Sequence, residues 1–207
     1  MRTVEWTDQN RVRMIDQRQV PWQLAYVEYD DYRMVAQAIA EMVVRGAPAI
    51  GVSAAFAMAL AGRQCPALDV GSLLEYLEVA AVILKKARPT AVNLAWAVDH
   101  MMNVARDERL DRADDIRAAL LAEAQHMADQ DVEINKQIAQ HGATLIKNGD
   151  TILHHCNTGM LATVDYGTAL GVIRMAHEQG KRIHVLLDET RPRLQGSRLS
   201  AWECEQL

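Results

Sequence analysis

The chain has 207 residues, of which 50% are hydrophobic and 24% are charged. This composition is typical of a globular domain and excludes a disordered, collagen-like or disulfide-stapled chain. Asp and Glu exceed Lys and Arg by 27 to 22, for a formal net charge of −5. A protein whose main work is to grip a nucleic-acid backbone shows the opposite balance, so no nucleic-acid partner is predicted.

No targeting or membrane segment is predicted. The chain start has no apolar stretch after Arg2, unlike a secretory signal. The longest uncharged run covers residues 46–62, is rich in Ala and Gly and contains Pro48, which favours a buried helix over a membrane span. Three widely spaced cysteines fit neither a disulfide framework nor a zinc site, and they predict a reducing cytoplasmic location: Cys65, Cys156 and Cys204.

The first elements combine strands with helices. Residues 11–16 and 23–28 are predicted strands around a turn at Pro21. Apolar residues then recur at helical spacing up to Val43, and this first helix is predicted to stop at Arg45-Gly46-Ala47-Pro48. The next helix is apolar on all sides, which predicts a central position.

Three more helices follow. Ser72 and Glu75 form a capping-box pattern at the start of the third, and Thr90 is the predicted cap of the fourth, over residues 91–106.

A long fifth helix is predicted from Ala113 to His141, with Gly142 as its stop signal. Five of its residues are expected to point inward: Ile116, Leu120, Met127, Ile134 and Ile138. Residues 1–147 are therefore predicted to form a mostly helical domain with a small β-sheet.

The pattern then changes to strand, helix, strand. Residues 151–156 and 183–188 flank a helix around 167–178, which predicts a βαβ unit with parallel strands, and 197–207 predicts another helix. The fold class is thus α/β, with 148–207 as the first part of a parallel-sheet domain. Two parallel strands do not make a stable sheet, so the missing strands are expected from a second polypeptide, or the chain is truncated. The alternative is an atypical small sheet that folds alone.

Two loops suggest phosphate binding. In the first, Arg45 precedes Gly46 and Ala47, where backbone N–H groups and a helix N-terminus are available to a ligand. In the second, Arg88 stands just before Pro89 and a helix start. Each loop alone is also explained as an ordinary turn.

A third loop carries a thiol. Cys156 follows the first parallel strand, and open α/β sheets bind ligands at that end of their strands. A nearby helix N-terminus lowers a thiol pKa and favours catalysis, although cysteines are also common buried residues. His154 and His155 are expected on opposite faces of the strand, so no metal site is predicted.

The fourth loop, residues 188–198, contains Gln195 and three arginines around Pro and Gly: Arg191, Arg193 and Arg198. This composition suggests recognition of an anion or of sugar hydroxyls, with a solvated basic loop as the alternative. Together, the four loops predict a small anionic substrate.

Four segments resemble the methylthioribose-1-phosphate isomerases of methionine salvage: RGAPAIG, RPTAVNLAWA, HCNTGMLATVDYGTALGVIR and DETRPRLQGSRLSAWE. These enzymes share a superfamily with regulatory subunits of the translation-initiation nucleotide exchange factor and with ribose-1,5-bisphosphate isomerases. The resemblance implies a Rossmann-like second domain and an aldose–ketose isomerisation without metal or organic cofactor. It implies Cys156 as the catalytic residue and five substrate-binding residues: Arg45, Gly46, Ala47, Arg88 and Gln195.

One motif of that family is absent. Its catalytic aspartate lies in a GADR-like sequence that does not occur in these 207 residues, so the chain alone is predicted to be inactive. A homodimer or a complementary C-terminal chain is expected. Three alternatives stay open: a ribose-1,5-bisphosphate isomerase, a non-catalytic regulatory subunit that senses a sugar phosphate or nucleotide, and a chain with an interaction role only.

Overall fold

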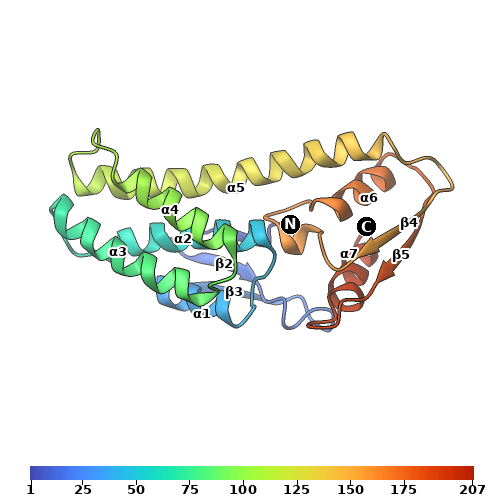
Figure 1. Cartoon of the computed structure of the whole chain (residues 1–207), viewed down its shortest axis with the longest axis horizontal. Helices are drawn as coiled ribbons and strands as arrows, with labels where there is room; N and C mark the ends of the chain where they lie inside the picture. The colour runs from blue at the N-terminus through green and yellow to red at the C-terminus, as the bar shows by residue number, and fades with distance from the viewer.

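A computed structural model describes residues 1–207 and confirms the α/β class, with a helical body at one end and a parallel strand pair at the other (Figure 1). The chain opens with an antiparallel sheet of order β1-β2-β3: β1 (Val4–Trp6), β2 (Val12–Ile15) and β3 (Tyr26–Tyr29). The sequence predicted β2, and it predicted β3 with a start three residues too early and an end one residue too early. It missed β1, because three residues are too few to show an alternating pattern.

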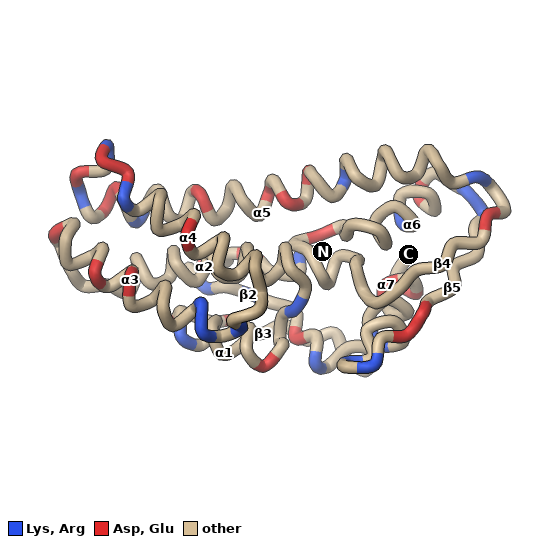
Figure 2. Tube along the Cα trace, in the orientation of Figure 1, with Lys and Arg blue, Asp and Glu red and all other residues tan.

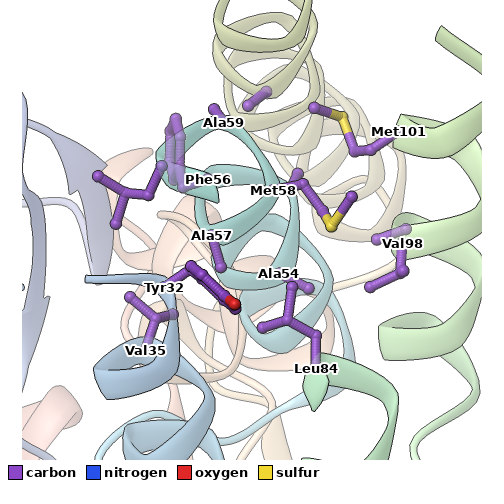
Figure 3. Close-up of a cluster of buried hydrophobic side chains, with 14 of the residues drawn as sticks. Tyr32, Val35, Ala54, Phe56, Ala57, Met58, Ala59, Leu84, Val98 and Met101 are labelled. Atoms are coloured by element: carbon purple, nitrogen blue, oxygen red, sulfur yellow. The ribbon is translucent and has the colours of Figure 1, made fainter. Parts of the chain in front are cut away.

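Five helices form the body: α1 (Tyr32–Ala40), α2 (Ala47–Gln64), α3 (Val70–Ala87), α4 (Val92–Ala105) and α5 (Ala113–Ala143). The predicted central helix is α2, which packs against the other four and buries every residue from Ala49 to Gly62. Figure 3 shows Met58 on the side of α2 that faces Met101 of α4, and Phe56 on another side. A helix apolar on all sides needs cover on all sides, and this arrangement supplies it.

Several predicted helix ends were wrong. The first helix ends at Ala40, because Met42 adopts a left-handed backbone conformation (φ 60°). The N-cap of α3 is Asp69, whose carboxylate accepts a bond from the Ser72 N–H at 2.8 Å, so Ser72 lies inside the first turn instead of capping it. Thr90 does not cap α4, which begins after Ala91 without a side-chain cap.

The long helix α5 extends one residue past Gly142, which was predicted to end it. A Cβ at Gly142 would lie 2.5 Å from the Val172 side chain, so this glycine permits close packing on the next helix. Ile134 and Ile138 are exposed, contrary to the prediction, although the three inward residues before them are buried. The first part of α5 packs on α2 and its last part packs on α6 (Ala169–Glu178). Because these two helices contact different sides of α5, the buried side of α5 changes along its length.

The second sheet pairs β4 (Thr151–His155) with β5 (His184–Asp188) in parallel, as predicted, with α6 between them in the chain. His154 is buried and His155 exposed, which confirms their opposite directions. Three short helical turns complete the chain: η1 (Met160–Ala162), η2 (Gly196–Ser200) and α7 (Ala201–Glu205).

Charged residues occur in most segments of the chain, apart from the uncharged run of residues 46–62. Figure 2 shows both acidic and basic segments at each end of the molecule. None of the helices has the length and apolar character that a membrane span requires.

Candidate active site

Three segments that are distant in sequence line one cavity of about 500 Å³. They are the loop and helix start from Met42 to Ile50, the segment from Arg88 to Asn93, and the segment from Pro192 to Gln195. Among the lining residues are all five that the resemblance implied for substrate binding: Arg45, Gly46, Ala47, Arg88 and Gln195. Tertiary folding therefore brings the first, second and fourth predicted loops together.

The cavity is positively charged. Arg45, Arg88 and Arg193 line it, and no Asp or Glu does. Burial lowers the pKa of Arg45, and the charge of Arg88 acts in the same direction. The buried Glu203 carboxylate, outside the cavity, opposes this lowering. Because no carboxylate lines the cavity itself, the site favours an anionic ligand.

Two helix N-termini add backbone donors to this charge. α2 begins directly after Gly46, and α4 begins after Ala91, with both residues lining the cavity. The first N–H groups of a helix have no partner inside it and carry partial positive charge, which suits phosphate. Gly46 has φ +96°, and a Cβ there would lie 2.3 Å from the Ala162 carbonyl oxygen, so only glycine fits this approach.

Cys156 lies next to the cavity without lining it. It follows β4 with φ 67° and is a free, half-buried thiol. Arg45 donates to the side-chain oxygen of Asn157, and also to its backbone oxygen at 3.2 Å. The residue after the thiol is thus bonded directly to a guanidinium of the cavity.

The loop after Cys156 also meets the start of α6. The Thr158 hydroxyl accepts a bond from the Leu170 N–H in the first turn of α6 at 3.2 Å. The sequence expected a helix start near the thiol; the start of α6 meets the chain two residues after Cys156, at Thr158. His155 pairs with Asp188 at 3.1 Å, on the exposed side of the strands and outside the cavity.

A buried carboxylate supports this loop, and sequence reasoning missed it. Glu203 is only 6% exposed and accepts bonds from Asn157 Nδ2 at 2.8 Å, Met160 N at 2.7 Å and Leu161 N at 3.3 Å. Burial raises the pKa of Glu203 to about 7. The one signal in the sequence is an acidic residue between Trp202 and Cys204 in an amphipathic segment, which is too common to indicate burial.

The three arginines of the fourth loop have different surroundings. Arg193 lines the cavity, whereas Arg191 is exposed outside it. Arg198 donates to the backbone oxygens of Arg18 and Val20, both at 2.9 Å, and so ties this loop to the N-terminal sheet region. Thr90, predicted only as a helix cap, lines the cavity as well, and so does Asn93, which the sequence did not single out.

The model of the initiation factor 2 subunit family matches residues 43–207. Over 200 residues, the chain is 55% identical to a methylthioribose-1-phosphate isomerase of Synechococcus, with 97% of this chain and 57% of the relative covered. The chain thus spans less than three fifths of that relative's length.

Two solved structures are similar. A 5-methylthioribose 1-phosphate isomerase from Pyrococcus horikoshii superposes with a TM-score of 0.92 at 43% identity, covering 99% of this chain and 57% of that one. A translation initiation factor eIF-2B subunit delta from A. fulgidus superposes with a TM-score of 0.89 at 42% identity, covering 100% and 59%. The fold is therefore shared by proteins that carry two different functional names.

Proposed function

The chain belongs to the initiation factor 2 subunit family, and from this premise we propose that it forms the substrate site of an isomerase that converts 5-methylthioribose 1-phosphate to 5-methylthioribulose 1-phosphate. One observation carries the proposal: three guanidinium groups and two helix N-termini converge on a cavity without carboxylates, beside a free thiol. The names of the Synechococcus and Pyrococcus relatives support the same reaction.

The residues that line the cavity suit both the phosphate end and the methylthio end of this substrate. Arg45, Arg88 and the N–H groups at the start of α2 suit the phosphate, as charge-assisted donors. Met42, Ile50 and Val92 provide an apolar region of the same cavity that suits a methylthio group better than a second phosphate. Gln195 lines the same cavity and offers an amide suited to a sugar hydroxyl.

The proposed reaction needs no oxidant or reductant. One hydrogen moves from C2 to C1 of the sugar, and a proton moves from the C2 hydroxyl to the ring oxygen as the ring opens. Cys156 takes part as the thiol beside Arg45, in proton handling or in stabilising the transition state. No Asp, Glu, His or Cys lines the cavity, and Cys156 beside it is a single proton donor or acceptor, so we propose that these residues alone bind the substrate without efficient turnover.

A regulatory subunit is the second candidate, because the similar A. fulgidus protein is named as a translation initiation factor subunit. A sensor of sugar phosphates or nucleotides would use the same arginines but would not need the Cys156 thiol. Ribose-1,5-bisphosphate isomerisation is the third candidate and differs in requiring a second phosphate.

Calorimetric titration of the 207-residue chain with three ligands separates these functions. We expect 5-methylthioribose 1-phosphate to bind more tightly than ribose 1,5-bisphosphate and than a nucleoside monophosphate, and Arg88→Ala to weaken its binding. Preference for the bisphosphate or for the nucleotide would favour the corresponding alternative. Equal affinities in the wild type and in Arg88→Ala would remove the cavity as the site.

Turnover is then measured on the chain alone and on a hybrid that continues into the remainder of the Synechococcus relative. We expect activity only in the hybrid, and Cys156→Ser to abolish it while leaving substrate affinity within about twofold. Cys65→Ala, a buried thiol outside the site, is the control. Full activity of Cys156→Ser would exclude the catalytic role of this thiol.

The proposed function also implies a cellular location and a second chain. Cys156 must stay reduced, which suits a cytoplasmic location. We propose a homodimer or a complementary C-terminal chain, supported by two leucines at the centre of the sheet face that this chain leaves uncovered: Leu153 is 68% and Leu186 47% exposed.

A further inference from the structure

Glu203 is a buried charge without an ion-pair partner in contact. It lies on α7 and does not line the 500 Å³ cavity. Its three hydrogen bonds all go to the loop that follows Cys156: to the Asn157 amide and to the N–H groups of Met160 and Leu161. Burying a carboxylate costs free energy, and all the hydrogen bonds of this one go to a single loop. We take this as a sign that the carboxylate holds that loop in position.

The Asn157 amide connects this carboxylate to the cavity. Its nitrogen donates to Glu203 Oε1 at 2.8 Å and to Ser200 Oγ at 3.2 Å, while its oxygen accepts from Arg45. An amide has one donating and one accepting end. Because Glu203 takes the donating end, the accepting end faces the Arg45 guanidinium, and no flipped amide satisfies both neighbours.

The backbone on either side of Asn157 is held by the same region. The Ser200 hydroxyl donates to the Cys156 carbonyl oxygen at 2.7 Å. A Cβ at Gly159 would lie 1.9 Å from Glu203 Oε2, so the loop closes directly onto the carboxylate. The bonds of Glu203 therefore fix the loop between the thiol and η1.

We propose that Glu203 is a positioning residue of the sugar-phosphate site: through Asn157 it holds the Arg45 guanidinium toward the cavity, and through Met160 and Leu161 it holds the loop that carries Cys156. This inference rests on the proposed function, since it assumes that Arg45 binds the substrate phosphate. Glu203 itself touches no substrate.

The test is titration of the 207-residue chain with 5-methylthioribose 1-phosphate at pH 8, where a group with a pKa of about 7 is ionised. Glu203→Gln presents an amide nitrogen to donors, and we expect its affinity to fall about tenfold or more. Glu205→Gln, an exposed neighbour on the same helix, should bind like the wild type. In an Arg45→Ala background, Glu203→Gln should change the affinity no further, while still changing the unfolding midpoint.

Each outcome decides the inference. Equal losses of affinity from Glu203→Gln with and without Arg45 would overturn it, because a merely structural role does not depend on Arg45. If Glu203→Gln does not fold, Asn157→Ser replaces it, since this variant keeps the bonds of Glu203 to Met160 and Leu161. Unchanged affinity of Asn157→Ser would overturn the inference. Unchanged affinity of both Arg45→Ala and Arg88→Ala would remove the proposed function and the inference with it.

Discussion

The half-buried Arg45 and the buried Glu203 carry opposite charges and do not touch. Asn157 lies between them and bonds to both. Burial lowers the pKa of Arg45 and raises the pKa of Glu203 to about 7, so each charge is held at a cost to stability. An anion bound in the cavity would compensate the desolvation of the Arg45 charge. Part of the binding free energy therefore comes from relieving this destabilisation of the empty site.

The raised pKa of Glu203 predicts a pH dependence of stability. The folded state binds this proton up to about pH 7, whereas a free glutamate releases it near 4.5. The contribution of protonated Glu203 to the free energy of unfolding is therefore fully present below about pH 4.5, and it is lost as the pH rises through 7. Between pH 5 and pH 8, we expect the free energy of unfolding to fall by roughly 2 to 3 kcal/mol more in the wild type than in Glu203→Gln. Urea unfolding at both pH values measures this, and parallel profiles would contradict it.

Arg193 and Arg191 form a matched pair on either side of Pro192. Only Arg193 lines the cavity. We expect Arg193→Ala to weaken the binding of 5-methylthioribose 1-phosphate about three- to tenfold, by the loss of one charge-assisted contact, and Arg191→Ala to leave it unchanged. Calorimetry of the two variants checks this, and equal effects would indicate a diffuse basic loop instead of a directed contact.

At the scale of elements, the site is built where helix starts meet a strand end. α2 and α4 begin at the cavity, and β4 ends beside it at the Cys156 loop. Gly46 connects these parts, because its backbone lies against Ala162 of η1. The turn that starts the central helix therefore also determines how close the thiol loop comes to the cavity.

Gly46→Ala tests this junction. A Cβ would strain the backbone at φ +96° and collide with the Ala162 carbonyl. Gly149→Ala is the control, with φ +90° and nothing within 4 Å. We expect Gly149→Ala to cost about 1 to 2 kcal/mol of stability and Gly46→Ala more than about 3 kcal/mol, together with loss of ligand binding. Similar thermal shifts for both variants would mean that the contact with Ala162 is not tight.

At the scale of the whole molecule, α5 joins the two ends, since it packs on α2 and on α6 (Figure 1). We propose that residues 1–147 and 148–207 are the two domains it connects. The second carries a parallel sheet of two strands, and parallel sheets are normally covered on both faces. The exposed Leu153 and Leu186 are paired in register on the open face.

We therefore expect the 207-residue chain to self-associate through this face. Sedimentation at tens of micromolar should show a dimer in the wild type and a monomer in a Leu153→Lys, Leu186→Lys double variant, because charges on an apolar interface oppose its burial. Leu145→Lys changes an exposed leucine before β4 and should stay dimeric. A monomeric wild type, or a dimer that survives the double variant, would reject this face as the interface.

The sequence by itself determined the local features: the central apolar helix, the βαβ unit, and the loops that contain Arg45, Arg88, Cys156 and Gln195. These depend on periodicity, on glycine and proline, and on residues close together in the chain. Only the tertiary structure decided that three loops share one cavity, that Arg193 lines it while Arg198 does not, and that Glu203 supports the Cys156 loop. Burial and hydrogen bonding between segments tens of residues apart leave no local pattern, which is why Glu203 and the exposed side of α5 could not be predicted.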